Sequence, residues 1–162
     1  MSRLDSVIRR LQAQRACLDC AAENVAGKQG VILEMGLGNG RTFDHLRDRL
    51  PDHEIHVFER EVRAHPDCVP DQDHLFLGDM RETLLQAEDR LKGSAVLIHA
   101  DIGTGDEERN RAFADWLGPA LRPFLAPDAV IVCDQEMRCY QAFQMDLPDG
   151  ISPGRYFMYN IK

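Results

Sequence analysis

Five short apolar runs, rich in β-branched residues, alternate with segments of helical periodicity along most of this chain. The runs are residues 31–35, 54–59, 74–77, 95–100 and 128–133. Near-continuous hydrophobicity of this kind is typical of strands that are covered on both faces. Apolar side chains at helical spacing mark the segments between them, which are residues 41–50, 81–91 and 107–125, the last with kinks expected at Pro119 and Pro123. This order predicts a three-layer α/β fold, in which helices cover both faces of a mostly parallel sheet.

The two ends of the chain extend this pattern. Residues 2–26 predict an amphipathic helix, and residues 155–161 predict a strand that pairs antiparallel at an edge of the sheet. Residues 60–73 are the weakest link, because two prolines there leave room for one helical turn at most. The length of 162 residues suits one domain, so we expect a single domain over 1–162 with an N-terminal helical extension at about 2–26.

Composition limits the binding partners and the cellular compartment that we expect for this chain. Nineteen Lys and Arg against 27 Asp and Glu give a formal net charge of −8, so we expect no binding to nucleic acid or to a membrane surface. Five cysteines, an odd number spread thinly, do not suggest a disulfide framework. No apolar run approaches the roughly 20 residues that span a bilayer, and the polar N-terminus has no signal-peptide core. The expectation is a cytoplasmic protein.

The most informative motif lies where the first strand meets the following helix. The strand ends in Glu34, and three glycines at alternate positions lead into the helix: Gly36, Gly38 and Gly40. Such glycines let a ligand approach the backbone next to free N–H groups at a helix N-terminus. The dinucleotide pattern Gly-x-Gly-x-x-Gly does not fit, because Arg41 and Phe43 stand where it requires glycine. The pattern acid-x-Gly-x-Gly-x-Gly instead resembles motif I of the class I S-adenosylmethionine-dependent methyltransferases.

Acidic residues at the ends of the next strands strengthen this resemblance. The acids that end four successive strands are Glu34, Glu59, Asp79 and Asp101. The resemblance implies a Rossmann-like fold and S-adenosyl-L-methionine as cofactor. The resemblance also implies a role for each acid. The Glu34 carboxylate reaches the ligand's amino group directly or through water, and Glu59 accepts hydrogen bonds from the ribose hydroxyls. Asp79 with its neighbour Met80 contacts adenine. The cofactor-binding residues that it implies are Glu34, Gly36, Gly38, Asn39, Gly40, Arg41, Thr42, Glu59, Asp79, Met80 and Asp101.

The end of the fourth strand offers candidates for the chemistry itself. Methyl transfer needs an aligned nucleophile and, for a protonated acceptor, a base. Asp101 and His99 are titratable and lie beside a flexible glycine loop, so either is a candidate catalytic residue. We expect no metal. A minor alternative is that Asp101, Asp134 and Gln135 hold Mg²⁺, by similarity to the cation-dependent catechol-type O-methyltransferases. The six histidines show no metal-ligand spacing, and Cys17 and Cys20 read as helix cysteines rather than a zinc site.

Three functions compete at this point. The first is a methyltransferase that acts on a small-molecule acceptor, because the chain lacks the motifs that nucleobase methylases carry and has little material outside the core. The second is a non-catalytic module that binds S-adenosyl-L-methionine, and the third, less favoured, is a nicotinamide-dependent oxidoreductase. A compact chain also suggests a homo-oligomer, a dimer or higher, formed through the N-terminal helix or the terminal strand.

Overall fold

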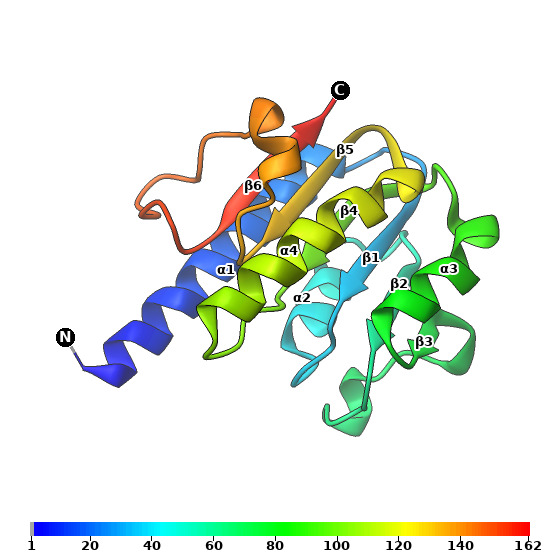
Figure 1. Ribbon diagram of the computed structural model, residues 1–162, viewed down its shortest axis with the longest axis horizontal. Helices are drawn as coiled ribbons and strands as arrows, with labels where there is room; N and C mark the ends of the chain where they lie inside the picture. Colours follow the sequence, from blue (N-terminus) through cyan, green and yellow to red (C-terminus); the bar gives the residue numbers. More distant parts are fainter. Residues whose placement is uncertain (1) are drawn as a thin grey trace.

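The computed structural model describes residues 2–162 and has one six-stranded sheet at its centre (Figure 1). The spatial order of the strands is β3-β2-β1-β4-β5-β6. The strands are β1 (Val31–Met35), β2 (Ile55–Glu59), β3 (Leu75–Leu77), β4 (Ala95–Ala100), β5 (Leu125–Cys133) and β6 (Phe157–Ile161). All pairs are parallel except β5 with β6, which is antiparallel. The mostly parallel sheet and its antiparallel edge strand are thus confirmed.

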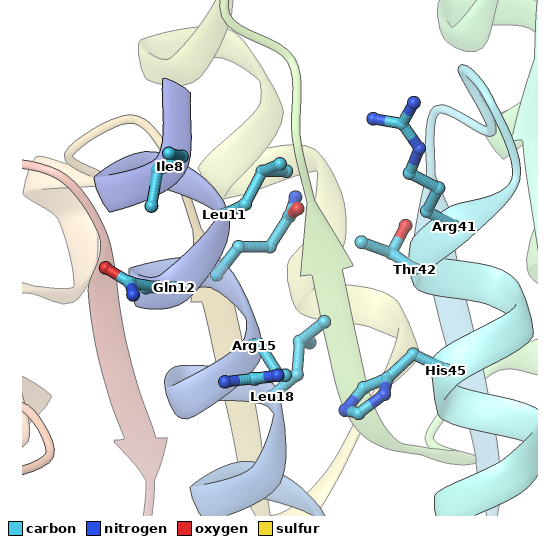
Figure 2. Close-up of a pocket in the computed structure, with 9 residues that line it drawn as sticks. Ile8, Leu11, Gln12, Arg15, Leu18, Arg41, Thr42 and His45 are labelled. Carbon is cyan, nitrogen blue, oxygen red and sulfur yellow. The ribbon is translucent and has the colours of Figure 1, made fainter. Parts of the chain in front are cut away.

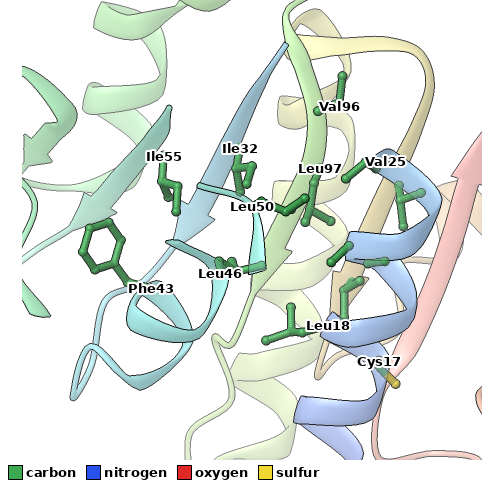
Figure 3. Packing of buried hydrophobic residues seen from close by; sticks show 14 of the residues in the cluster. Cys17, Leu18, Val25, Ile32, Phe43, Leu46, Leu50, Ile55, Val96 and Leu97 are labelled. Carbon is green, nitrogen blue, oxygen red and sulfur yellow. The ribbon is translucent and has the colours of Figure 1, made fainter. Parts of the chain in front are cut away.

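Four helices form the outer layers. They are α1 (Arg3–Val25), α2 (Arg41–Arg49), α3 (Met80–Leu91) and α4 (Glu107–Leu121). Buried side chains of α1 and α2 pack on one face of the sheet and those of α3 and α4 on the other (Figure 3 shows the first of these clusters). Successive residues of β1 face opposite clusters, since Ile32 belongs to the first and Leu33 to the second. This double coverage is why the strands are apolar without interruption.

The N-terminal helix belongs to the core. Ser2 caps α1 through a reciprocal pair of hydrogen bonds with Asp5. Its buried face consists of Ala13, Gln14, Cys17, Leu18, Ala21, Ala22 and Val25. These side chains fill the space over β4 and β5 and beside α2. The helix expected at 2–26 is therefore present, but it is a full member of one layer rather than an appendage.

The structure corrects two boundaries. The helix expected over 107–125 ends at Leu121, and a 3₁₀ turn over Arg122–Phe124 leads into β5, which begins at Leu125 instead of residue 128. Pro123 lacks the N–H that a continuing helix would need. One helical turn at most was expected over residues 60–73, but the structure has two 3₁₀ turns, Pro66–Cys68 and Gln72–His74, the second of which extends one residue beyond that range. Within residues 2–162, no helix is long and apolar enough to cross a membrane.

Candidate active site

The carboxyl ends of the parallel strands lie along one edge of the sheet. At β1 the direction in which successive strands are added across the sheet reverses. β1 lies between β2 and β4, so connections leave it on both sides. In open α/β sheets this switch point forms a crevice that binds ligands. The glycine loop, residues 36–40, joins β1 to α2 at this point (Figure 1).

Positive φ angles explain why this loop requires glycine. Gly38 has φ +51° and Gly40, the N-cap of α2, has φ +77°. A Cβ on Gly40 would lie 2.5 Å from the Cys68 Cβ, so this glycine allows the loop to pack against the chain. A Cβ on Gly38 would meet nothing within 4 Å. Gly38 therefore borders open space, and a ligand can approach its backbone.

Glu34 lies beneath this loop rather than on its surface. Its side chain is fully buried, and its two oxygens accept hydrogen bonds from the Thr42 hydroxyl and, at 2.9 Å, from His99 Nδ1. His99 is equally buried and stacks on Tyr156 with 6.3 Å between ring centroids. These contacts make Glu34 a support for the first turn of α2, and they place His99 away from open space.

The burial of His99 and the charge beside it act on its pKa in opposite directions. Burial alone lowers the pKa of His99, because the imidazolium loses its hydration. The Glu34 carboxylate and its hydrogen bond outweigh that effect, helped by the charges of Asp101 and Asp134. The net result is a pKa above the ordinary histidine value, which favours the charged form of His99 beside Glu34.

Glu59 ends β2 and holds the glycine loop. One carboxylate oxygen accepts from the backbone N–H groups of Leu37 at 2.7 Å and Gly38 at 3.0 Å. The other accepts from the N–H groups of Arg60 at 2.7 Å and Glu61 at 3.3 Å. A carboxylate offers about four lone-pair positions, so Glu59 is fully used in this structure.

Asp79 caps the next helix at the same edge. It accepts from the Arg81 N–H at 2.8 Å and from the Arg60 guanidinium at 3.2 Å. The Arg81 N–H is the main reason that the pKa of Asp79 lies below its usual value. Between β2 and α4 lies a cavity of about 380 Å³. The residues that line it include Gly36, Phe58, Glu59, Asp79, Met80 and Phe113.

Asp101 connects the end of β4 to α1. Its Oδ2 accepts from the Arg10 guanidinium at 3.1 Å and from the Gln14 amide at 2.8 Å. Gln14 also contacts the Tyr156 hydroxyl at 2.6 Å. Asp101 Oδ1 has no hydrogen bond in the part of the chain that the structure describes. Sequence reasoning missed Arg10, Gln14 and Tyr156; the available signal was a polar residue at position 14, on the apolar face of the predicted helix.

Asp134, at the end of β5, fixes the loop that follows β4. Its oxygens accept from the N–H groups of Ile102 at 3.0 Å and Gly103 at 2.8 Å, and from the Gln135 amide at 3.1 Å. Burial, and then the neighbouring Asp101, raise the pKa of Asp134. Both Asp134 oxygens are thus engaged in protein contacts, whereas Asp101 Oδ1 is not, and the Mg²⁺ alternative stays an untested prediction.

A second cavity, of about 430 Å³, lies between α1 and α2 (Figure 2). Its lining residues are Ile8, Leu11, Gln12, Gln14, Arg15, Leu18, Arg41, Thr42 and His45. A smaller hollow of about 80 Å³ beside Gly38 and Asp101 shares four of these residues, namely Leu11, Gln14, Arg41 and Thr42. The smaller hollow also shares Gly36 with the cavity beside Glu59. Three hollows therefore lie one after another along the strand ends, from Asp79 to α1, and adjoin at the residues that they share.

The chemistry of these walls fits a nucleoside joined to an amino acid. Glu59 and Asp79 offer carboxylates to hydroxyl and amino donors at one end. Around the small hollow, Gly38 exposes its backbone, and Asn39, Arg41 and Thr42 offer polar groups. Of the cofactor-binding residues expected from the sequence, all but the buried Glu34 and Gly40 line these cavities.

A doubly wound sheet, a glycine loop at its switch point and an acid at each neighbouring strand end define the class I S-adenosylmethionine-dependent methyltransferase fold. A family model described as S-adenosyl-L-methionine methyltransferase matches residues 1–161. The chain belongs to this family, and its cofactor is S-adenosyl-L-methionine. The family match supports neither a nicotinamide cofactor nor an oxidoreductase.

Solved structures agree with this assignment. An S-adenosyl-L-methionine methyl transferase from Silicibacter pomeroyi DSS-3 is 42% identical, with a TM-score of 0.93, over 100% of this chain and 99% of that one. Two distant structures share only the fold. The mycinamycin-pathway methyltransferase MycE has 15% identity and a TM-score of 0.58, over 96% of this chain and 47% of its own. A release-factor-specific protein-(glutamine-N5) methyltransferase from Alicyclobacillus acidocaldarius has 12% identity and a TM-score of 0.57, over 93% and 92%. No curated protein matches the sequence.

Proposed function

We propose that this methyltransferase acts on a small acceptor that combines an apolar part with an anionic group. The cavity between α1 and α2 carries this proposal, because it adjoins the small hollow beside Gly38. Its walls are apolar at Ile8 and Leu11, and two arginines face it, Arg15 and Arg41. Within residues 2–162, neither arginine has an ionic partner. Two free guanidinium groups beside an apolar wall suit a carboxylate or phosphate on a small apolar molecule.

The residues proposed to hold the cofactor divide between two sites. Glu59 would accept the ribose hydroxyls, and Asp79 with Met80 would contact the adenine in the cavity beside them. Gly36 to Thr42 would surround the amino-acid portion. When bound, S-adenosyl-L-methionine supplies a methyl group on a sulfonium, which a nucleophile can displace in line.

Asp101 is the proposed catalytic base. It stands in the wall of the small hollow, its side chain is 28% exposed, and its Oδ1 is free to accept a proton from the acceptor. His99, the other candidate, lies below the site and contacts Glu34. We assign His99 the role of a positioning residue, which holds Glu34 and through it Thr42.

Transfer of labelled methyl groups tests the proposal. Purified protein is incubated with methyl-labelled cofactor and a set of small apolar carboxylates and phosphates. We expect transfer to at least one of them. Cofactor binding without transfer to any acceptor would instead favour the non-catalytic module.

Matched pairs of variants separate the two parts of the site. Gly38→Val should abolish calorimetric binding of S-adenosylhomocysteine. Gly93→Val is the control, because Gly93 also has a positive φ, +66°, and an open Cβ direction but precedes β4 at the other end of the sheet.

Arg15→Glu should raise the KM of an anionic acceptor about ten-fold or more. Arg9→Glu, on the same helix but outside the cavity lining, should not. Unchanged binding in Gly38→Val would contradict the cofactor site, and equal KM values would contradict the acceptor site.

A further inference from the structure

Three potential metal ligands meet at the end of the sheet opposite the glycine loop. Glu54 and His56 lie at the start of β2, and His74 lies in the 3₁₀ turn that leads into β3. One ligand atom from each lies within 4.8 Å of the other two. His74 is distant from Glu54 and His56 in the sequence. The parallel pairing of β2 with β3 brings it beside His56.

The spacing of these atoms suits a tetrahedral ion. Glu54 Oε2 lies 3.4 Å from His56 Nε2 and 3.6 Å from His74 Nε2. Zn²⁺ binds such ligands at about 2.0–2.2 Å, so neighbouring ligand atoms around a tetrahedral ion are roughly 3.3–3.6 Å apart. Two of the three separations therefore match those around a tetrahedral ion, and the third pair of ligand atoms lies within 4.8 Å.

His56 supplies an independent indication of a ligand. Its side chain is 1% exposed, and among residues 2–162 neither of its ring nitrogens has a hydrogen-bond partner. Buried polar groups are nearly always paired, so a buried imidazole with no hydrogen bond calls for an explanation.

The surroundings of His74 match those of a metal-bound histidine. Its Nδ1 lies 2.7 Å from Asp71 Oδ1, and a carboxylate at this position fixes the proton on Nδ1 and turns the Nε2 lone pair toward the ion. Glu54 is 65% exposed and His74 is 26% exposed, which leaves an open side for entry and for a water ligand. Two carboxylates, Glu54 and Asp71, and one guanidinium, that of Arg90, lie near the two histidines.

We propose that Glu54, His56 and His74 bind a divalent transition metal, with Zn²⁺ the best match to two imidazoles and one carboxylate. The site is separate from methyl transfer and does not depend on the function proposed above. Its role is structural: the ion links β2 to β3, an edge strand of only three residues.

Metal titration of the chelator-treated, full-length protein tests the site. We expect one equivalent of Zn²⁺ to bind and to raise Tm, and Co²⁺ to give the intense visible absorption of a tetrahedral complex. His56→Gln, His74→Ala and Glu54→Gln should each weaken Zn²⁺ binding by about 100-fold or more, and Asp71→Asn by about 10- to 100-fold. His65→Ala, an exposed histidine outside the group, should bind as the wild type does.

Retained binding of S-adenosylhomocysteine, at the far end of the sheet, will show that each variant is folded. The proposal is overturned if the wild type binds no Zn²⁺. It is equally overturned if a folded His74→Ala or Glu54→Gln variant binds Zn²⁺ as tightly as His65→Ala.

Discussion

Glu34 and His99 form a buried ion pair at paired positions of β1 and β4. Burying two charges is costly unless each is hydrogen-bonded; Thr42 and His99 Nδ1 satisfy the Glu34 carboxylate, whereas His99 Nε2 has no hydrogen-bond partner among residues 2–162. The result is a fixed carboxylate under the first turn of α2. We interpret the pair as the support that keeps the glycine loop in its ligand-ready shape.

The raised pKa of His99 predicts how stability depends on pH. Above pH 6.5 the unfolded histidine loses its proton, whereas the folded one still holds it. The native state then binds more protons, so this contribution to the free energy of unfolding is full below pH 6.5. It declines as pH rises through the folded pKa. Urea unfolding at a series of pH values above 6.5 measures this decline.

Glu34→Gln is the control for this prediction. An amide keeps the shape and the Thr42 contact but removes the charge that raises the pKa of His99. Burial alone then lowers that pKa, and the decline above pH 6.5 should disappear. His56 does not interfere, because its lowered pKa affects stability below pH 6.5. A wild-type stability that is flat or rising over the same range would contradict the assignment.

At the scale of elements, α1 is the helix whose role differs most from expectation. It carries core residues and supplies Arg10 and Gln14 to Asp101. Leu18 is 1% exposed, so Leu18→Ala should lower the free energy of unfolding by about 2–5 kcal/mol, measured by urea unfolding. Leu85→Ala on α3, where the side chain is 74% exposed, should change it by less than about 0.5 kcal/mol. If α1 were a separate extension, Leu18→Ala would leave the main transition unchanged.

Most elements could be predicted from the sequence because the sheet is buried on both faces. The run Ala95–Ala100, for example, is a strand with the predicted bounds. The start of β5 was missed because the apolar helical spacing continues through Leu121 and Phe124, so the helix was expected to run to residue 125. Asp128 has a positive φ of 58°, yet the strand continues through it. The register of β5 against β4 shifts between Leu125 and Val130, and Asp128 lies within this irregularity.

The candidate site was predictable only where topology determines it. Parallel strands bring their carboxyl ends together, so Glu59, Asp79 and Asp101 could be placed without a structure. The contact between Arg10 and Asp101 spans 91 residues and depends on how α1 crosses the sheet. No local pattern encodes that crossing. No local pattern encodes the approach of His74 to His56 either, because this approach depends on the register of β2 and β3.

For the whole molecule, the structure favours one of the two routes of self-association. The outer edge of β6 is partly covered, because Gln144 pairs with Tyr159 and the Met145 N–H donates to the Met158 carbonyl. The first turns of α1, which project past the sheet (Figure 1), instead expose an apolar stripe at helical spacing. The stripe is Leu4, Val7 and Ile8, which are 68%, 48% and 44% exposed.

We therefore predict a homodimer formed through this stripe. Leu4→Glu places a charge at its centre and should shift the protein to monomers in sedimentation equilibrium. Leu85→Glu, an equally exposed leucine on α3, should leave the dimer intact. A wild-type monomer, or a dimer that both variants preserve, would contradict the prediction.

The saturated Glu59 carboxylate has an energetic consequence for cofactor recognition. Four backbone N–H groups already occupy it, so ribose hydroxyls must exchange with existing hydrogen bonds rather than fill vacant positions. The binding free energy gained from the sugar is then the small difference between two states in which the Glu59 carboxylate is fully hydrogen-bonded. In the proposed cofactor site, affinity would then come chiefly from the adenine and the amino-acid ends of the ligand, and Glu59 would serve more to select a ribose than to hold it.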